Sequence, residues 1–137
     1  MRLSLISKLF LLVLAVSLPI VGANFNTAFA DDSLDGKTFS VKINEHGKND
    51  DVRDDELIFK DGTFFSTDCG QYGFDAAPYE YRATDGVTMF ITSTKSEKEG
   101  EIQWEGRAEG NEISGTMIWS KPGQEPIFYK YKGSLKK

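Results

Sequence analysis

The stretch that decides the fold of this 137-residue chain is Trp104-Glu105-Gly106-Arg107-Ala108-Glu109-Gly110-Asn111-Glu112-Ile113-Ser114-Gly115-Thr116. Gly110-Asn111 is a two-residue turn, and its leading glycine suits the type II′ geometry of a β-hairpin. The turn sets Ala108 opposite Ile113 and Trp104 opposite Met117. One face of the hairpin is then apolar or small, whereas the other carries polar and charged side chains. This alternation predicts an antiparallel hairpin with one buried face.

The chain after residue 30 repeats this period-two pattern in short runs, which Gly-containing turns separate. Such a series is typical of an antiparallel sandwich or barrel. Short connections make neighbouring strands antiparallel. Closure into an up-and-down barrel also removes exposed edges, so we expect an all-β, eight-stranded antiparallel barrel, with a two-sheet sandwich as the alternative. The expected strands are 38–43, 57–60, 63–67, 79–83, 87–93, 102–109, 113–119 and 127–132.

The turn at Asp85-Gly86 allows two registers for its hairpin. A two-residue turn would set Met89 opposite Arg82, which mixes an apolar with a charged side chain. A three-residue turn that includes residue 84 pairs Met89 with Tyr81 instead. We expect the three-residue turn, because a one-residue slip moves a whole strand's side chains to the wrong face.

Two further segments have no clear strand pattern, and the strand at 63–67 holds one ambiguity. Residues 45–55 are polar and acidic, and we interpret them as an exposed loop. Residues 68–77 are rich in glycine and predict a flap across a barrel mouth. Phe64 and Phe65 are adjacent and must point in opposite directions, so one of them lies outside the core or under a loop.

The first thirty residues predict export. Arg2 and Lys8 precede an apolar run from Leu9 to Val16, and Ala28-Phe29-Ala30 supplies a small-x-small cleavage pattern. This order is that of a secretory signal peptide. The apolar run is shorter than the roughly 20 residues of a spanning helix. We therefore expect residues 31–137 to form a single periplasmic or extracellular β-barrel domain without a membrane span.

The charge of the expected mature chain argues against two classes of partner. The leader holds two of the 16 basic residues and none of the 21 acidic ones, which leaves 14 against 21 and a net charge of −7. Such a surface repels nucleic acid and anionic membranes.

The hairpin at 104–116, with the eight expected strands, resembles the Gly-rich hairpins of calycin-like barrels, the group of lipocalins, fatty-acid-binding proteins and avidins. Leu34-Asp35-Gly36-Lys37-Thr38-Phe39 is similar to their N-terminal entry, although it lacks the tryptophan of the lipocalin Gly-x-Trp pattern. The resemblance covers most of residues 34–135 and implies the barrel fold. Function does not follow from the fold alone.

Reactive side chains are few, and we expect no enzyme activity, cofactor or metal site. His46, the single histidine, lies in a polar stretch, and no motif relates it to Cys69 as a base to a nucleophile. Cys69 is either a small buried group or, in an oxidising compartment, the link of a disulfide homodimer. An acidic cluster lacks the spacing of a calcium loop and is interpreted as solvated; it comprises Asp50, Asp51, Asp54, Asp55 and Glu56.

The remaining candidates are side chains expected to face the barrel interior. Eight strands leave an interior that side chains fill or that holds one small ligand, and both alternatives remain open from the sequence. The leading hypothesis is a non-catalytic barrel that binds a small apolar or amphipathic ligand. The alternative is a protein-binding barrel, an envelope assembly factor or hydrolase inhibitor, acting through 45–56 and 68–77. The expected ligand-lining residues are Tyr79, Tyr81, Met89, Trp104, Gly106, Gly115, Met117, Trp119, Tyr129 and Tyr131.

Overall fold

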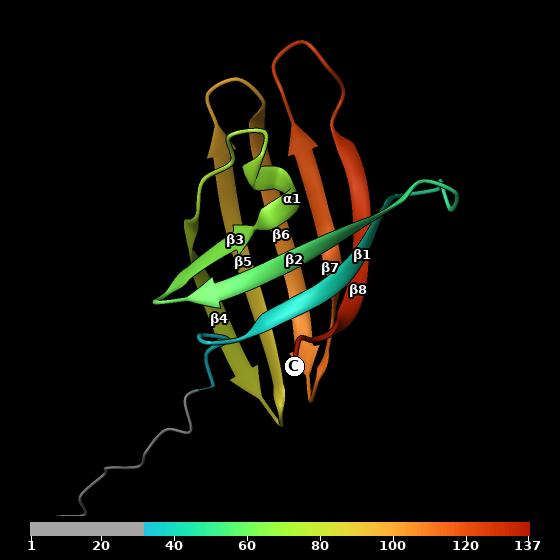
Figure 1. Cartoon of the computed structure of the whole chain (residues 1–137). Helices are drawn as coiled ribbons and strands as arrows, with labels where there is room; N and C mark the ends of the chain where they lie inside the picture. Colours follow the sequence, from blue (N-terminus) through green and yellow to red (C-terminus); the bar gives the residue numbers. More distant parts are fainter. Residues whose placement is uncertain (1–31) are drawn as a thin grey trace, which may run out of the picture. The chain divides into compact units, whose positions relative to one another are not determined.

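The structure, a computed structural model, describes residues 32–137 as one closed antiparallel barrel whose strands follow one another in chain order (Figure 1). The last strand pairs with the first, which confirms the eight-stranded barrel and excludes the two-sheet sandwich. The predicted signal peptide lies outside the described residues. The elements are β1 (Thr38–Glu45), β2 (Val52–Lys60), β3 (Thr63–Ser66), α1 (Thr67–Gly70), β4 (Ala77–Thr84), β5 (Val87–Ser96), β6 (Gly100–Glu109), β7 (Glu112–Ser120) and β8 (Ile127–Leu135).

The β6–β7 hairpin has the predicted register. Ala108 pairs with Ile113, Gly106 with Gly115 and Trp104 with Met117. The apolar members of these pairs are buried. The register that the two-residue turn imposes therefore also buries the apolar residues, and the predicted hairpin is confirmed.

The predicted register of the β4–β5 hairpin is wrong. Asp85 and Gly86 both have positive φ, 53° and 79°, which is the signature of a two-residue type I′ turn. Arg82 consequently pairs with Met89, and Met89 points outward with 51% of its surface exposed. Asp-Gly is a preferred sequence for this turn, and that preference outweighed the burial of one methionine.

The predicted acidic loop at 45–55 is also too long. β2 begins at Val52, so only residues 46–51 form the connection to β1. The alternation of β2 turns Asp55 inward beside Leu57, and just 5% of Asp55 is exposed. The interpretation of Asp55 as a solvated loop residue is therefore wrong.

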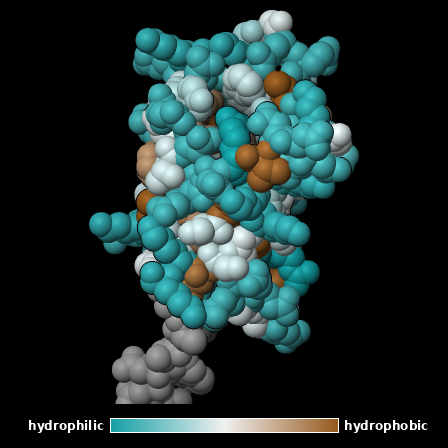
Figure 2. All heavy atoms as spheres, turned by 45° about the vertical axis from the view of Figure 1, so that its right-hand side comes forward, coloured by the Kyte–Doolittle hydropathy of each residue, from teal (hydrophilic) through white to brown (hydrophobic). Residues whose placement is uncertain are grey.

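Aromatic rings fill the core of the barrel. Phe59 lies at the centre of one group, with ring centroids 5.0 Å from Phe90, 5.1 Å from Tyr79 and 5.3 Å from Phe64. Trp104 continues this packing, 4.9 Å from the ring of Phe64 and 5.6 Å from that of Tyr131. The outer face drawn in Figure 2 is mostly hydrophilic, with hydrophobic residues in small separate areas.

The glycine pair of the β6–β7 hairpin makes room for Tyr131. A Cβ atom at Gly106 would lie 2.2 Å from the Tyr131 hydroxyl oxygen, and one at Gly115 would lie 2.4 Å from it. The hydroxyl donates a hydrogen bond to the Glu105 carbonyl oxygen at 2.9 Å. The space between the glycines is thus occupied by a protein side chain, and the middle of the barrel is filled.

The segment before β1 covers the barrel away from α1. Leu34 is 1% exposed, and its backbone N–H donates to the Tyr79 hydroxyl at 3.1 Å. That hydroxyl donates to Asp35 Oδ1 at 2.7 Å. Burial, and next the hydrogen bond to Asp35, raise the pKa of Tyr79 to about 12, so it stays a neutral donor.

We predict that Gly106→Ala destabilises the barrel by about 1–3 kcal/mol, because the added methyl group meets Tyr131 and Phe90. In a Tyr131→Phe background the same substitution should cost less, since the nearest atom, the hydroxyl oxygen, is gone. Urea denaturation of the four proteins of this double-mutant cycle measures the coupling. Equal costs in both backgrounds would contradict the close packing of Tyr131 on Gly106.

Candidate functional site

A cavity of about 300 Å³ lies at the barrel mouth, at the end where α1 and the β5–β6 and β7–β8 loops are found (Figure 1). Its barrel wall is apolar and consists of Ile102, Met117, Trp119 and Tyr129. Cys69 of α1 and Phe74, both buried, face this wall. The cavity therefore lies between the strands and the segment that crosses the mouth.

Its rim is polar and carries both signs of charge. Arg53 of β2 and Asp68 of α1 form an ion pair with 3.6 Å between Nη1 and Oδ2. Across the cavity, Glu99 pairs with Lys121 at 3.0 Å, and its carbonyl oxygen accepts a hydrogen bond from Trp119 Nε1 at 2.6 Å. The Trp119 indole is thereby fixed in orientation at the edge of the apolar wall.

The helix α1 forms because Ser66 caps its first turn. The Ser66 hydroxyl oxygen accepts a hydrogen bond from the Cys69 N–H at 3.2 Å. Asp68 places a negative charge in the same turn, which a helix N-terminus favours. Phe65, just before the cap, points away from the interior and lies against Gly70. The opposite orientations of Phe64 and Phe65 and the mouth position of 68–77 were both predicted; α1 itself was not.

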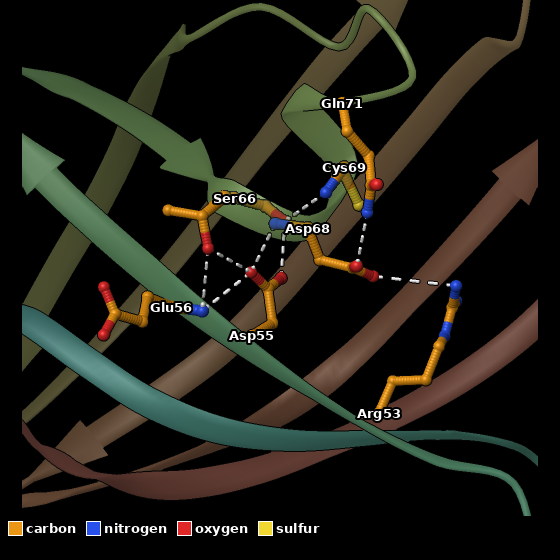
Figure 3. Close-up of polar contacts among 8 residues, drawn as sticks. Arg53, Asp55, Glu56, Ser66, Asp68, Cys69 and Gln71 are labelled. Carbon is orange, nitrogen blue, oxygen red and sulfur yellow. Dashed lines mark hydrogen bonds and ion pairs between the residues drawn. The ribbon is translucent and has the colours of Figure 1, made fainter.

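Asp55 attaches this helix to β2 (Figure 3). Its carboxylate accepts hydrogen bonds from the Ser66 hydroxyl, from the Thr67 hydroxyl at 3.1 Å and from the Asp68 N–H at 2.9 Å. The Glu56 N–H donates a fourth at 2.7 Å. One buried carboxylate thus orders the start of the segment that bounds the cavity.

Burial raises the pKa of Asp55, and the hydrogen bonds to its charged form offset this only in part. The folded state therefore binds the proton at higher pH than the unfolded state does. The contribution of this group to stability is largest at low pH and falls as the pH rises from 3.8 through the raised pKa.

The rest of the mouth segment is fastened to β5. The Ser96 hydroxyl donates to the Tyr72 carbonyl oxygen at 2.8 Å, and the Asp75 N–H donates to the Lys95 carbonyl oxygen at 3.4 Å. Phe74 is 5% exposed and inserts beneath the segment. Residues 67–75 are consequently held at both ends.

The predicted ligand-lining residues fall into four groups. Met117, Trp119 and Tyr129 line the mouth cavity. Tyr81 faces the same side as Tyr79 but is 49% exposed, and Met89 lies outside because of the two-residue turn. The remaining residues pack within the filled part of the barrel or make room for its rings: Tyr79, Trp104, Gly106, Gly115 and Tyr131.

The polar side of the cavity is not predicted from the sequence. Arg53 is not among the predicted residues because the second strand is expected to begin only at residue 57. Asp68 is not among them because 68–77 is predicted only as a flap, with no lining residues assigned. Extending the alternation of the second strand backward from Leu57 would have placed Arg53 and Asp55 on the inner face. Ile102 lies on the same buried face of β6 as Trp104, but it is not among the predicted ligand-lining residues.

His46 and Cys69 lie in different parts of the structure. His46 is exposed in the β1–β2 connection, whereas Cys69 is buried in α1. In the part of the chain from 32 to 137, no three His, Cys, Asp or Glu side chains are grouped to hold a metal ion. Over the same residues, no helix is long and apolar enough to cross a membrane.

Comparison with known proteins gives no match: no family model, no curated protein and no solved structure matches this chain.

We predict that Asp55→Ala destabilises the protein by about 2–3 kcal/mol, because it leaves the Ser66, Thr67 and Asp68 donors without their acceptor. Asp54→Ala is the matched control. Asp54 is exposed and pairs with exposed Lys42, so its loss should change the free energy of unfolding by under about 0.5 kcal/mol. Chemical denaturation measures both, and equal effects would show that Asp55 does not hold α1.

We also predict that the Cys69 thiol of the native protein reacts slowly. Burial raises its pKa to about 11, and 7% of the residue is exposed. Labelling with a thiol reagent at pH 8 should be at least about tenfold slower in native than in urea-unfolded protein, since the thiolate is the reactive form. Equal rates would mean that the mouth segment does not cover Cys69.

A disulfide homodimer through Cys69 stays a prediction, and it requires this segment to open first.

Proposed function

We propose that this protein is an exported, non-catalytic barrel of the calycin-like kind that binds a small amphipathic molecule in its mouth cavity. The observation that carries the proposal is the cavity itself: an apolar wall of Ile102, Met117 and Tyr129 beneath a polar rim. Pockets for small ligands commonly combine a largely apolar lining with a few polar groups that set orientation. The strand order and closure support the calycin-like comparison at the level of architecture.

The filled core limits the size of the ligand. A volume of about 300 Å³ is at the lower end for ligand pockets. Tyr131 and Trp104 block the path deeper into the barrel, because both are nearly fully buried against their neighbours. A compact ring or short chain fits this space, whereas a long lipid chain does not.

The rim suggests how such a ligand would be oriented. Its apolar part would lie on Met117 and against the ring of Tyr129, where it leaves water. Its polar end would reach Arg53 or Asp68. These two side chains are 3.6 Å apart, beyond hydrogen-bond distance, so either of them could bind the ligand in place of the other. Binding would then follow from shape and desolvation, with no chemical step.

Export remains part of the proposal and follows from the residue order of 1–30. The alternative, a protein-binding barrel acting through 45–56 and 68–77, stays a prediction. Of the first segment, residues 46–51 form the exposed connection; the second is fastened across the mouth.

We predict that 8-anilinonaphthalene-1-sulfonate, an amphipathic fluorescent probe, binds the native protein and that Met117→Trp weakens this binding at least about tenfold by filling the cavity. Phe128→Trp, which introduces the same side chain at an exposed position outside the cavity, should bind the probe like the wild type. Circular dichroism establishes that each variant is folded. If Met117→Trp does not fold, Tyr129→Ala, which removes a half-buried ring from the apolar wall, should also weaken probe binding.

Equal probe affinity in the wild type and both cavity variants would overturn the proposed site. Native mass spectrometry of protein purified from its own host identifies what the cavity holds. A co-purifying small mass that is lost in Met117→Trp supports the proposal, and a stoichiometric protein partner would favour the alternative.

A further inference from the structure

The outer face of β4, β5 and β6 carries two exposed apolar side chains in a regular frame of charges. Met89 and Ile91 are 51% and 53% exposed and lie two residues apart on β5. Strand pairing sets Met89 between Arg82 of β4 and Arg107 of β6. It sets Ile91 between Glu80 and Glu105 on the same two strands.

These six residues form two rows across the strands, which we name the arginine row (Arg82, Met89, Arg107) and the glutamate row (Glu80, Ile91, Glu105). All six side chains point outward, because each lies at an alternate position of its strand from an inward residue such as Phe90 or Trp104. Among them, Arg107 has an ion pair with Glu109 at 3.0 Å, and both partners are exposed. Because all six residues are exposed, the surface is accessible to a second molecule.

The pattern is complementary to itself. Consider two copies face to face, related by a two-fold axis that runs across the strands between the two rows. The arginine row of each copy then lies on the glutamate row of the other, which creates four Arg–Glu contacts. Met89 of one copy lies on Ile91 of the second copy at the centre, where both lose exposed apolar surface.

The charge pattern also favours this axis over one that runs along the strands. A two-fold axis parallel to β5 would place arginine on arginine and glutamate on glutamate. Like charges in contact repel each other, so this second arrangement is disfavoured.

We propose that two copies of this chain associate through this face as a non-covalent, two-fold symmetric dimer. The arrangement is independent of Cys69 and of ligand binding. The mouth cavity is lined by other residues, so each dimer would present two free cavities. Because two convex barrels touch over a small area, we expect weak association that falls with rising salt.

Charge reversal of whole rows tests the proposal. The first variant, Arg82→Glu with Arg107→Glu, makes both rows acidic; the second, Glu80→Arg with Glu105→Arg, makes both rows basic. Sedimentation velocity over a concentration series should show that each variant alone dimerises at least about tenfold more weakly than the wild type. An equimolar mixture of the two should form a heterodimer, and a chain with all four substitutions should regain the wild-type dimer.

Lys42→Glu, a reversal at an exposed position of β1 outside the rows, is the control and should dimerise like the wild type. All substitutions are at exposed positions, and thermal melts establish that the variants are folded. A wild type that stays monomeric at every concentration would overturn the proposal and leave the face to another partner. A dimer that persists in both row variants, or that only Cys69→Ser removes, would overturn it as well.

Discussion

Tyr131 fills the space that Gly106 and Gly115 leave open. This packing separates the filled middle of the barrel from the cavity at its mouth. Gly106 and Gly115 face each other across β6 and β7, and the Tyr131 hydroxyl donates to Glu105 between them at 2.9 Å. The ring also contacts Trp104, which links β8 to the aromatic group around Phe59. A pair of glycines in a barrel wall is compatible with a hollow interior. Here their role is to let a large side chain from the next strand lie flat against the wall, because a Cβ at either position would overlap it.

Closing the middle of the barrel confines any ligand to one end. There the interior side chains Ile102 and Met117 are covered by α1, and the position of α1 depends on a single buried carboxylate. Burying Asp55 raises its pKa and so has a cost in free energy, but three donors at residues 66–68 require an acceptor. The apolar cavity thus depends on the polar network around Asp55, because this network holds α1 over the cavity.

The sequence predicts the barrel and most of its strands because alternation and turn chemistry usually point to the same register. At Gly110-Asn111 both favour one pairing, and the prediction is confirmed. At Asp85-Gly86 they conflict: burying Met89 requires a three-residue turn, whereas Asp-Gly favours the two-residue type I′ turn that the chain adopts. Local backbone conformation outweighed the burial of one side chain, so an apolar strand residue is not by itself evidence of an inward position. The cavity could not be predicted from the sequence, because it arises between residues far apart in the chain, such as Cys69 and Met117.

The filled middle of the barrel depends on Tyr131 occupying the space beside the glycine pair. The direct measurement is a nuclear Overhauser spectrum of the isotope-labelled protein in solution. We expect strong cross-peaks from the Tyr131 ring protons to the α-protons of both Gly106 and Gly115, and none from that ring to water. Missing glycine cross-peaks, or a Tyr131 ring in contact with water, would show a hollow barrel and contradict the account.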